Sequence, residues 1–304
     1  MVSYDPRSAS RIGLGCMALT GIYGPISRDV AVRIIQRAIE LGVTHFDTAE
    51  LYGPYLNEEL LAEALGPDQK NVEIATKFGY RFQNGKIVGL DSMPRSIRAA
   101  VEGSLKRLRR DYVDVLYQHR PDPALPIEDV IGTMSDLVKE GKARTLGLSA
   151  TDPQSLRRAH AVHPISFVQN EFSLIQRDPE KELLPSIRGS STDFVCYSPL
   201  GRGLLAGTAK IGNRAPTDYR SNDVRFQPQH LAEITDRLAQ LWRIAAYREA
   251  SSASVALAWL LSKEPSIRII PGATSVEQLE ANIRSSEVNL TDEEIESLNL
   301  IGNA

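Results

Sequence analysis

Short apolar runs alternate with longer amphipathic stretches along most of the chain. The short runs are apolar at successive positions, which is typical of strands that are covered on both faces. We expect eight such strands, at residues 11–17, 45–49, 72–78, 113–119, 145–149, 167–172, 193–198 and 267–273.

The longer stretches have the period of an amphipathic helix. In 29–41, for example, Val30, Ile34, Ala38 and Leu41 recur at helical spacing. Similar patterns span 93–108, 127–140, 153–162 and 276–285. Because eight strands alternate with helices, the sequence predicts an α/β fold of the (β/α)8 TIM barrel type.

The C-terminal part of the chain adds one helix to these units. Residues 291–300 follow the eighth strand and its helix, and we expect them to form an extra C-terminal helix on the outside of the barrel. Two helix starts fit a capping box, Ser275 with Gln278 and Thr291 with Glu294. No Pro/Ser-rich linker divides the chain, so we expect a single barrel domain over residues 1–304.

One segment lacks this periodicity. Residues 207–229 are rich in Gly, Asn, Pro and Asp and are too long for a routine connection in a barrel. We expect a lid or binding loop there.

Composition narrows the class of partner. A net charge of -3 and a pI near 6.0 provide no field that would attract a phosphate backbone, so we expect no nucleic acid partner. Two distant cysteines, without CxxC or Cys/His spacing, indicate reduced thiols and no metal site. The N-terminus lacks the pattern of a signal peptide and no window is apolar enough to span a membrane, so we expect a cytoplasmic protein with no membrane partner.

Polar residues end several of the apolar runs. In a TIM barrel the C-terminal ends of the strands form the active site. Asp47 ends the second expected strand, Lys77 the third and His119 the fourth, and Tyr52 follows Asp47 on the next loop. We therefore expect these four side chains to converge on one part of the rim.

Their chemistry suggests proton transfer to a carbonyl oxygen. A nearby ammonium favours the phenolate form of a tyrosine, so Lys77 is expected to lower the pKa of Tyr52, while Asp47 keeps Lys77 charged. A neutral His119 would orient the carbonyl oxygen as Tyr52 donates its proton. Each residue also has a structural interpretation, as a loop cap, a solvated lysine, a packing tyrosine or a backbone-bonded histidine.

Several motifs together resemble the aldo-keto reductase superfamily. The stretches FDTAELYG, IATKFG, LYQHR, GLSA, VQNEFS, YSPLGRGLL and IPGATSVEQLEAN are similar to the blocks of that family, in order, over almost the whole chain. Within the superfamily, GCMALTGIYG, HRPDP and SPLGRGLLAG resemble the branch that includes perakine reductase and pyridoxal reductases.

The resemblance implies that NADPH (NADP⁺) is the cofactor, with NADH as a possible substitute. It implies a catalytic tetrad of Asp47, Tyr52, Lys77 and His119, with Tyr52 as the proton donor. It also implies that the cofactor is bound by Cys16, Met17, Asp47, Ser149, Gln169, Tyr197, Ser198, Pro199, Leu200, Gly201, Arg202, Gly203, Ala273, Thr274, Ser275, Gln278 and Asn282.

The chain departs from the family pattern at the adenosine phosphate. Gly272 and Gln278 stand where other branches have lysine and arginine, which weakens the expected preference for NADPH over NADH. Basic residues in or near the aperiodic segment could compensate; they are Arg202, Lys210, Arg214, Arg220 and Arg225. Ala150 replaces a second polar residue, so Ser149 and Gln169 are expected to hold the carboxamide.

We therefore expect an oxidoreductase that reduces an aldehyde or ketone to an alcohol, with a small carbonyl compound as partner and the oligomeric state open. Candidate substrate residues on the active loops are Tyr23, Tyr55, Phe78, Tyr80, Arg120 and Phe226. Two alternatives remain, a lyase that forms a Schiff base on Lys77 and a non-catalytic subunit that senses NADPH. A metal-dependent hydrolase is disfavoured because only His45 and His119 fall on expected strands.

Overall fold

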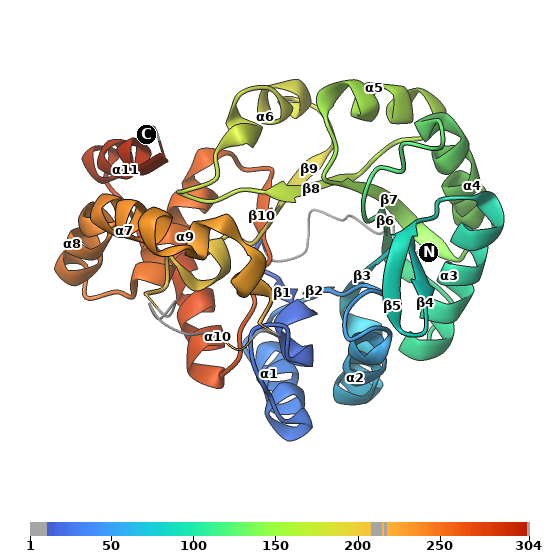
Figure 1. Cartoon of the computed structure of the whole chain (residues 1–304), viewed down its shortest axis with the longest axis horizontal. Coiled ribbons are helices and arrows are strands. Elements are labelled where there is room, and N and C mark those ends of the chain that lie inside the picture. Colours follow the sequence, from blue (N-terminus) through green and yellow to red (C-terminus); the bar gives the residue numbers. More distant parts are fainter. Residues whose placement is uncertain (1–10, 208–214, 216–217, 303–304) are drawn as a thin grey trace.

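The computed structural model describes residues 11–207, 215 and 218–302. Its centre is an eight-stranded parallel sheet, surrounded by helices (Figure 1). The strands of this sheet are β1 (Leu14–Gly15), β2 (His45–Asp47), β3 (Glu73–Phe78), β6 (Val113–Gln118), β7 (Ala143–Ser149), β8 (Phe167–Glu171), β9 (Asp193–Tyr197) and β10 (Ile267–Ile269). The eight strands fall within or within two residues of the eight predicted ranges, and the barrel prediction is confirmed.

The first and last strands close the sheet into a barrel. A parallel bridge joins Ile12 to Ile269, and the Gly13 amide donates to the Ile269 carbonyl at 2.8 Å. At Gly15 the two segments approach so closely that a Cβ atom would lie 2.5 Å from the carbonyl oxygen of Ile270. Only glycine permits this approach, which brings the end of β1 next to the residues after β10.

The helices form the outer layer. They are α1 (Arg28–Glu40), α2 (Leu56–Leu65), α3 (Pro94–Leu108), α4 (Ile127–Lys139), α5 (Pro153–Val162), α6 (Leu183–Ile187), α7 (Pro228–Arg237), α8 (Ala239–Tyr247), α9 (Ser252–Lys263), α10 (Val276–Ile283) and α11 (Asp292–Asn299). Figure 1 shows α7, α8 and α11 together on the outer side of α9. The predicted C-terminal helix is α11, and its capping box between Thr291 and Glu294 is confirmed.

The helix start at α10 differs from the prediction in one bond. The Ser275 hydroxyl accepts from the Gln278 amide, as in a capping box. The side chain of Gln278, however, accepts from the amide and the hydroxyl of Thr274, one residue before the expected donor. The first turn of α10 is therefore closed by two residues of the preceding loop.

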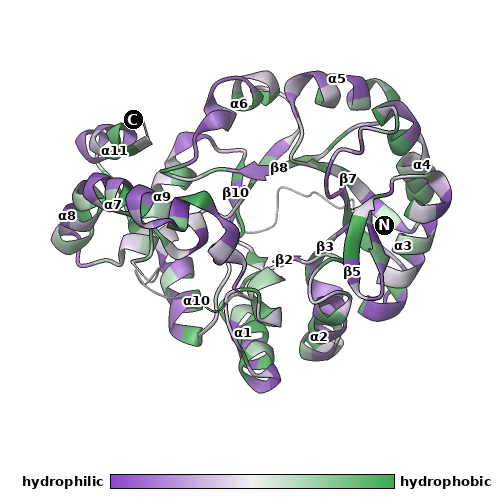
Figure 2. Cartoon of the chain, viewed as in Figure 1, coloured by the Kyte–Doolittle hydropathy of each residue, from purple (hydrophilic) through white to green (hydrophobic). Residues whose placement is uncertain are grey.

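Successive side chains of each strand point to opposite faces of the sheet, and this divides the core into two clusters. A small apolar cluster of Ala75, Val115, Tyr117, Phe167, Val195 and Ile270 fills the barrel interior. The larger cluster lies between the sheet and the helices and includes neighbours of these residues such as Ile74 and Phe194. Hydrophilic and hydrophobic residues alternate around the outer helices (Figure 2), as expected for helices with one buried face.

An antiparallel hairpin interrupts the barrel pattern after β3. It consists of β4 (Tyr80–Gln83) and β5 (Lys86–Leu90) and was not predicted, because its strands are short and largely exposed. The predicted aperiodic segment is described from 218 onward, where it forms the 3-10 turns Tyr219–Asn222 and Val224–Phe226 before α7 begins. Within the described part of the chain, no helix has the length and apolar character needed to cross a membrane.

Candidate active site

A cavity of about 540 Å³ lies at the C-terminal ends of the strands. Its wall includes residues that follow five different strands, together with the first turn of α10. Among the residues expected from the sequence, the wall contains Met17, Tyr23, Asp47, Tyr52, His119, Arg120, Ser149, Gln169, Tyr197, Ser198, Pro199, Leu200, Arg202, Gly203, Ala273, Thr274, Gln278 and Asn282.

Lys77 lies behind this wall and connects the polar groups. It faces the barrel interior and is 1% exposed, since alternation along β3 turns it away from the helices. Its Nζ donates to Oδ1 of Asp47, to the Thr48 carbonyl at 2.9 Å and to the Tyr52 hydroxyl at 3.2 Å. Burial lowers the pKa of Lys77, and the charge and hydrogen bond of Asp47 oppose that shift.

Asp47 is held from two sides. Its Oδ1 accepts from Lys77, and its Oδ2 accepts from the side-chain amide of Gln169 at 2.7 Å. Both oxygens of this buried carboxylate therefore have a hydrogen-bond donor, which compensates for their removal from water. Gln169 was expected to bind a cofactor carboxamide, and in this structure its side-chain nitrogen donates a hydrogen bond to Asp47.

Tyr52 stands on the loop between β2 and α2. The loop forms a turn in which the Tyr52 amide donates to the Ala49 carbonyl at 3.1 Å. Burial raises the pKa of the Tyr52 phenol well above its usual value, and the negative charge of Asp47 adds to this rise. This corrects the expectation that Lys77 lowers that pKa, since burial is the largest cause of the shift and the cation that opposes it is Arg120.

His119 follows β6 and packs between two tyrosine rings. The centroids of Tyr52 and Tyr80 lie 5.9 and 5.2 Å from the imidazole, both in edge-on geometry. Burial lowers the pKa of His119 well below its usual value, and the charges of Lys77 and Arg120 lower it further. The imidazole is therefore neutral at physiological pH, as expected for a group that orients a carbonyl oxygen.

Arg120 lies beside His119 at the same end of the barrel. Its Nη1 donates to the His119 carbonyl at 2.9 Å and to the Ser149 hydroxyl at 3.3 Å. Its guanidinium carbon is 5.6 Å from the ring centroid of Tyr197. Ser149 and Tyr197, two expected cofactor residues, are thus both in contact with an arginine.

The other half of the cavity has a different character. After β9 the chain turns through Ser198 and Arg202, both in the left-handed conformation, with φ of 48° and 56°. The first turn of α10 faces the same cavity through Thr274 and Gln278. A helix start combines amide donors with a positive dipole, so this half suits an anionic group.

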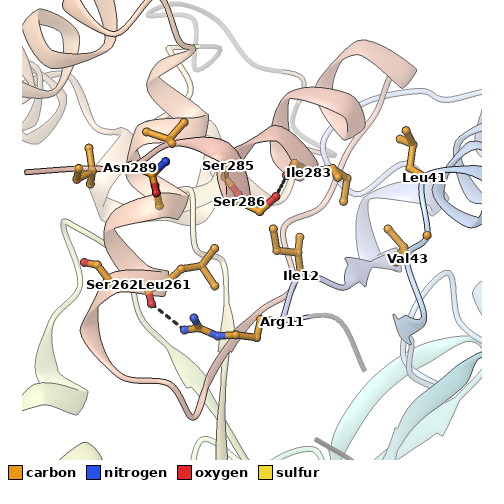
Figure 3. Close-up of a pocket in the computed structure, with 14 residues that line it drawn as sticks. Arg11, Ile12, Leu41, Val43, Leu261, Ser262, Ile283, Ser285, Ser286 and Asn289 are labelled. Atoms are coloured by element: carbon orange, nitrogen blue, oxygen red, sulfur yellow. Dashed lines mark hydrogen bonds between the residues drawn. The ribbon is translucent and has the colours of Figure 1, made fainter. Parts of the chain in front are cut away.

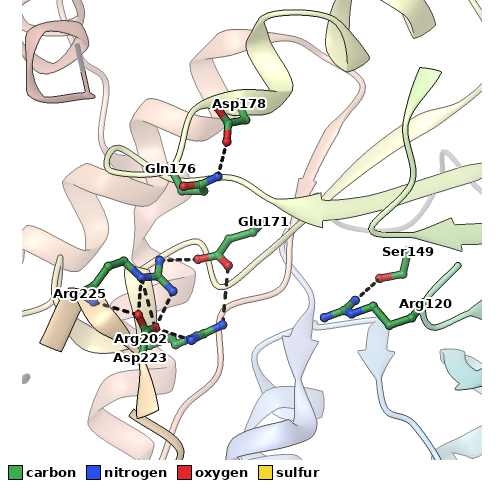
Figure 4. Close-up of polar contacts among 8 residues, drawn as sticks. All are labelled: Arg120, Ser149, Glu171, Gln176, Asp178, Arg202, Asp223 and Arg225. Atoms are coloured by element: carbon green, nitrogen blue, oxygen red, sulfur yellow. Dashed lines mark hydrogen bonds and ion pairs between the residues drawn. The ribbon is translucent and has the colours of Figure 1, made fainter. Parts of the chain in front are cut away.

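Two arginines near this half are already paired with acids. Arg202 and Arg225 both contact Asp223 and Glu171, with Arg225 to Glu171 at 2.6 Å and Arg202 to Glu171 at 3.7 Å (Figure 4). Lys210 and Arg214 lie outside the described residues. The compensating charge expected from this segment is therefore largely neutralised for Arg202 and Arg225.

The structure keeps other expected residues away from the cavity wall. Phe78 lies next to Lys77 on β3 and therefore points to the opposite face, into the core outside the barrel. Tyr55 packs on Phe82 on the far side of its loop, and Phe226 is buried against the core. Tyr80 supports the His119 ring from outside the wall.

Three expected cofactor residues also lie outside the wall. Cys16 is completely buried, and burial raises the pKa of its thiol. Gly201 is buried in a 3-10 turn, and Ser275 is engaged in capping α10. Cys16 and Gly201 therefore contribute no side chain to the cavity wall, and the Ser275 hydroxyl supports the cavity indirectly by capping α10.

Sequence reasoning missed part of the wall. Tyr219, which was not expected, and Arg220, which was expected only as a compensating charge, reach the cavity from a 3-10 turn. The Tyr219 amide donates to the Ile22 carbonyl and the Arg220 side chain to the Tyr23 carbonyl, both at 3.0 Å, and these bonds hold the turn against the first loop. The remaining residues are Gly15, Ala18, Ala206, Ser251, Ala253, Ile270, Pro271, Gly272, Glu277 and Ala281. Most are small or apolar, and neither property distinguishes a wall residue in a sequence.

A second hollow, of about 590 Å³, opens next to the start of β1 (Figure 3). Arg11 lines it, but its guanidinium is engaged by the carbonyls of Leu261, Glu264 and Ile267. Ser285 and Ser286 both donate back to carbonyls one turn earlier in the chain. These groups have no catalytic arrangement like that of the first cavity.

Known proteins resemble this chain over almost its whole length. The sequence model of the Aldo/keto reductase family matches residues 11–302. The chain is 37% identical over 291 residues to the probable aldo-keto reductase 1 of Glycine max, and the match covers 95% of this chain and 84% of that protein.

Solved structures show the same relationship. The glycerol dehydrogenase AKR11B4 from Gluconobacter oxydans superposes with a TM-score of 0.86 at 31% identity, covering 96% of this chain and 91% of that one. The aldo-keto reductase AKR11C1 from Bacillus halodurans, in its holo form, gives a TM-score of 0.78 at 27% identity, covering 97% and 93%.

Proposed function

The chain belongs to the aldo/keto reductase family, and on that premise we propose that it reduces an aldehyde or ketone to an alcohol with NADPH, with Tyr52 as the proton donor. Membership of the family implies an oxidoreductase that acts on carbonyl compounds. The observation that carries the finer proposal is the convergence of Tyr52, Lys77, Asp47 and His119 at one end of the cavity. We place the reaction in the cytoplasm, on a small-molecule substrate.

The cavity suits a nicotinamide cofactor. It connects the polar cluster around Tyr52 with the first turn of α10, so one elongated molecule can contact both. A hydroxyl and an aromatic ring lie at the first end, and amide donors with a helix dipole lie at the second. When bound, the cofactor supplies the hydride that the described side chains lack.

The residues that would hold it divide into two groups. At the reactive end we assign Met17, Ser149, Gln169 and Tyr197. At the phosphate end we assign Ser198, Pro199, Leu200, Arg202, Gly203, Ala273, Thr274, Gln278 and Asn282. Cys16 and Gly201 keep a supporting role behind the cavity wall, and Ser275 supports the wall by capping α10 with its hydroxyl.

The protein's own groups manage the proton. Tyr52 holds a proton because burial raises the pKa of its phenol, so it can donate to the oxygen of a reduced carbonyl. Lys77 stabilises the phenolate that remains, from 3.2 Å, and Asp47 keeps Lys77 in place. Neutral His119 orients the carbonyl oxygen toward Tyr52.

Few positive charges of the described cavity wall are free to bind the 2′-phosphate that distinguishes NADPH from NADH. Gln278 presents an uncharged amide at the start of α10, and its oxygen is already engaged by Thr274. Arg202 is paired with Asp223. We therefore propose NADPH as the main cofactor with measurable activity on NADH.

The two alternatives fit the structure less well. A Schiff base needs an accessible, uncharged lysine, whereas Lys77 is 1% exposed and paired with Asp47. A subunit that only senses NADPH would not need a proton donor beside a neutral histidine. Borohydride trapping with substrate distinguishes the first, because a reductase gives no covalent adduct on Lys77.

A turnover assay tests the proposal directly. NADPH oxidation is followed by absorbance over a panel of aldehydes, ketones, quinones and keto sugars, and NADP⁺ reduction over the matching alcohols. We expect turnover on at least one class, with NADPH used better than NADH. Tight NADPH binding without turnover on any member would support the sensing subunit and contradict the proposal.

A further inference from the structure

Arg120 differs from the other arginines of the cavity wall in its partners. Within residues 11–207, 215 and 218–302, no carboxylate forms an ion pair with it, and its hydrogen bonds go to uncharged partners, namely the His119 carbonyl, the Ser149 hydroxyl and the Tyr80 side chain. Figure 4 shows its guanidinium directed toward Ser149, apart from the acids that bind Arg202 and Arg225. Arg120 therefore brings an uncompensated positive charge to the reactive end.

The neighbouring cations do not share this property. Arg220 contacts Asp218 at 2.7 Å, and Arg202 shares Asp223 with Arg225. Lys77 is paired with Asp47 behind the wall. Among the arginine and lysine side chains of the described cavity wall, only that of Arg120 lacks an acidic partner.

A half-buried cation without a counter-ion is unfavourable. Removal of a guanidinium from water costs free energy that neutral acceptors only partly restore. Arg120 has five N–H donors in a planar fork, and its bonds to His119 and Ser149 start from the same nitrogen, Nη1. An anion that accepts from the remaining donors would satisfy both the charge and the geometry.

The reaction itself would change the contacts of Arg120. Arg120 donates a hydrogen bond to Ser149 and forms a cation–π contact with Tyr197. We assign both of these residues to the binding of the nicotinamide. A nicotinamide bound to these residues would compete with Arg120 for the Ser149 hydroxyl. Its fork is then released beside His119, where the carbonyl substrate is expected.

Arg120 also lies close enough to act on the proton donor. Its positive charge opposes the rise in the pKa of Tyr52 and of Tyr80. A substrate group bound to Arg120 would therefore be near the reacting carbonyl.

We propose that Arg120 determines substrate specificity by binding a carboxylate on the carbonyl substrate, so that the enzyme prefers aldehydes or ketones that carry an acid group. This inference rests on the proposed reductase function. One uncompensated positive charge matches the single charge of a carboxylate, and the planar fork matches its two oxygens. A phosphate, with nearly two charges, would need a second free cation that the described wall does not offer.

A matched pair of aldehydes tests this inference. 4-Carboxybenzaldehyde and 4-nitrobenzaldehyde have the same shape and differ in charge, and kcat/KM is measured for both with NADPH. In Arg120→Gln we expect the ratio of kcat/KM for the carboxylate over that for the nitro compound to fall on the order of 10- to 100-fold, because an effect of the lost charge on Tyr52 acts on both aldehydes alike. Arg120→Lys keeps the charge without the fork and should lie between.

Binding is measured separately from turnover. Calorimetry with 4-methylbenzoate, in the presence of NADP⁺, should show weaker binding to Arg120→Gln by a similar factor, whereas the dissociation constant of NADPH stays within about 3-fold of wild type. Arg158→Gln serves as the matched control, since it removes an arginine paired with Glu128 on the outer surface. We expect wild-type values from it.

The outcomes separate the inference from its premise. If no aldehyde is reduced, the proposed function fails. If both aldehydes are reduced but Arg120→Gln affects them equally, or weakens NADPH instead, the reductase stands and the role of Arg120 is refuted. A stronger preference for 4-formylphenyl phosphate than for the carboxylate would also overturn the assignment of a carboxylate.

Discussion

Lys77 donates from Nζ to the carboxylate of Asp47, and both side chains are almost completely shielded from solvent, at 0% and 2% exposure. Two opposite charges buried in this way stabilise each other only while both are present. The ammonium also reaches Tyr52 at 3.2 Å, so the same pair supports the fold and the proposed proton donor.

Loss of one member of this pair should affect both properties. In Lys77→Met we expect turnover to be abolished and the free energy of unfolding to fall by about 3 kcal/mol, because Asp47 is left as a buried charge without its cation. The double variant Asp47→Asn with Lys77→Met should regain much of that stability but no turnover. Chemical denaturation and NADPH oxidation measure the two effects. Additive losses of stability would mean that the pair is not coupled.

Removal of the Tyr52 hydroxyl tests the proton donor. Tyr52→Phe keeps the ring beside His119 and removes the proton, so we expect kcat to fall on the order of 10² or more. The dissociation constant of NADPH, measured by fluorescence, should change little. Tyr112→Phe is the control, because that hydroxyl accepts from Arg144 and lies outside the cavity wall. Near-native kcat in Tyr52→Phe would contradict the assignment.

Glu50 should make the stability of the protein depend on pH. Burial raises the pKa of its carboxyl from 4.5 to about 7, and the charge of Glu58 adds to the rise. The unfolded chain therefore releases this proton at a lower pH than the folded protein, so Glu50 reduces stability as pH rises from 4.5 toward about 7.

Glu50→Gln should reverse that effect. The amide oxygen can still accept from Gly79, which donates to Glu50 at 3.2 Å. We expect no difference from wild type near pH 4 and a gain of about 1–3 kcal/mol near pH 8, measured by denaturant unfolding. Glu59→Gln, on the exposed face of α2, should change little at either pH. An equal gain at both values would show that ionisation of Glu50 is not involved.

A positive charge at the start of α10 should change cofactor choice. Gln278→Arg places a guanidinium where the proposed 2′-phosphate binds, although it removes the bonds from Thr274. We expect the ratio of kcat/KM for NADPH over NADH to rise on the order of 10-fold through charge-assisted bonds. Gln154→Arg adds the same charge at the start of α5, away from the cavity, and should leave the ratio unchanged. An unaltered ratio in Gln278→Arg would place the phosphate elsewhere.

The strand ends could be predicted because barrel strands are apolar and end abruptly. Asp47, Lys77 and His119 stood out as polar residues after such runs, and the structure brings them together with Tyr52. Backbone geometry converts this one-dimensional pattern into a shared rim. The capping box at Thr291 is similarly local and was predicted for the same reason.

Other features depend on contacts that no local pattern records. Phe78 was expected in the pocket because it follows Lys77, yet one step along a strand reverses the side chain. Tyr219 reaches the wall only because its amide bonds to Ile22, far away in sequence. The pKa of Tyr52 depends on how deeply the phenol is buried, and that depth is set by the packed tertiary structure.

Closure of the barrel between Gly13 and Ile269 has a consequence for biosynthesis. A ribosome makes the N-terminal edge of the sheet first, and the strand that pairs with it, β10, emerges after the seven other strands of the barrel. Until then β1 has an open edge and the apolar barrel interior lacks one side. The α10 end of the cavity is made after β10, so the proposed cofactor finds a complete cavity in a nascent chain only once α10 has been made.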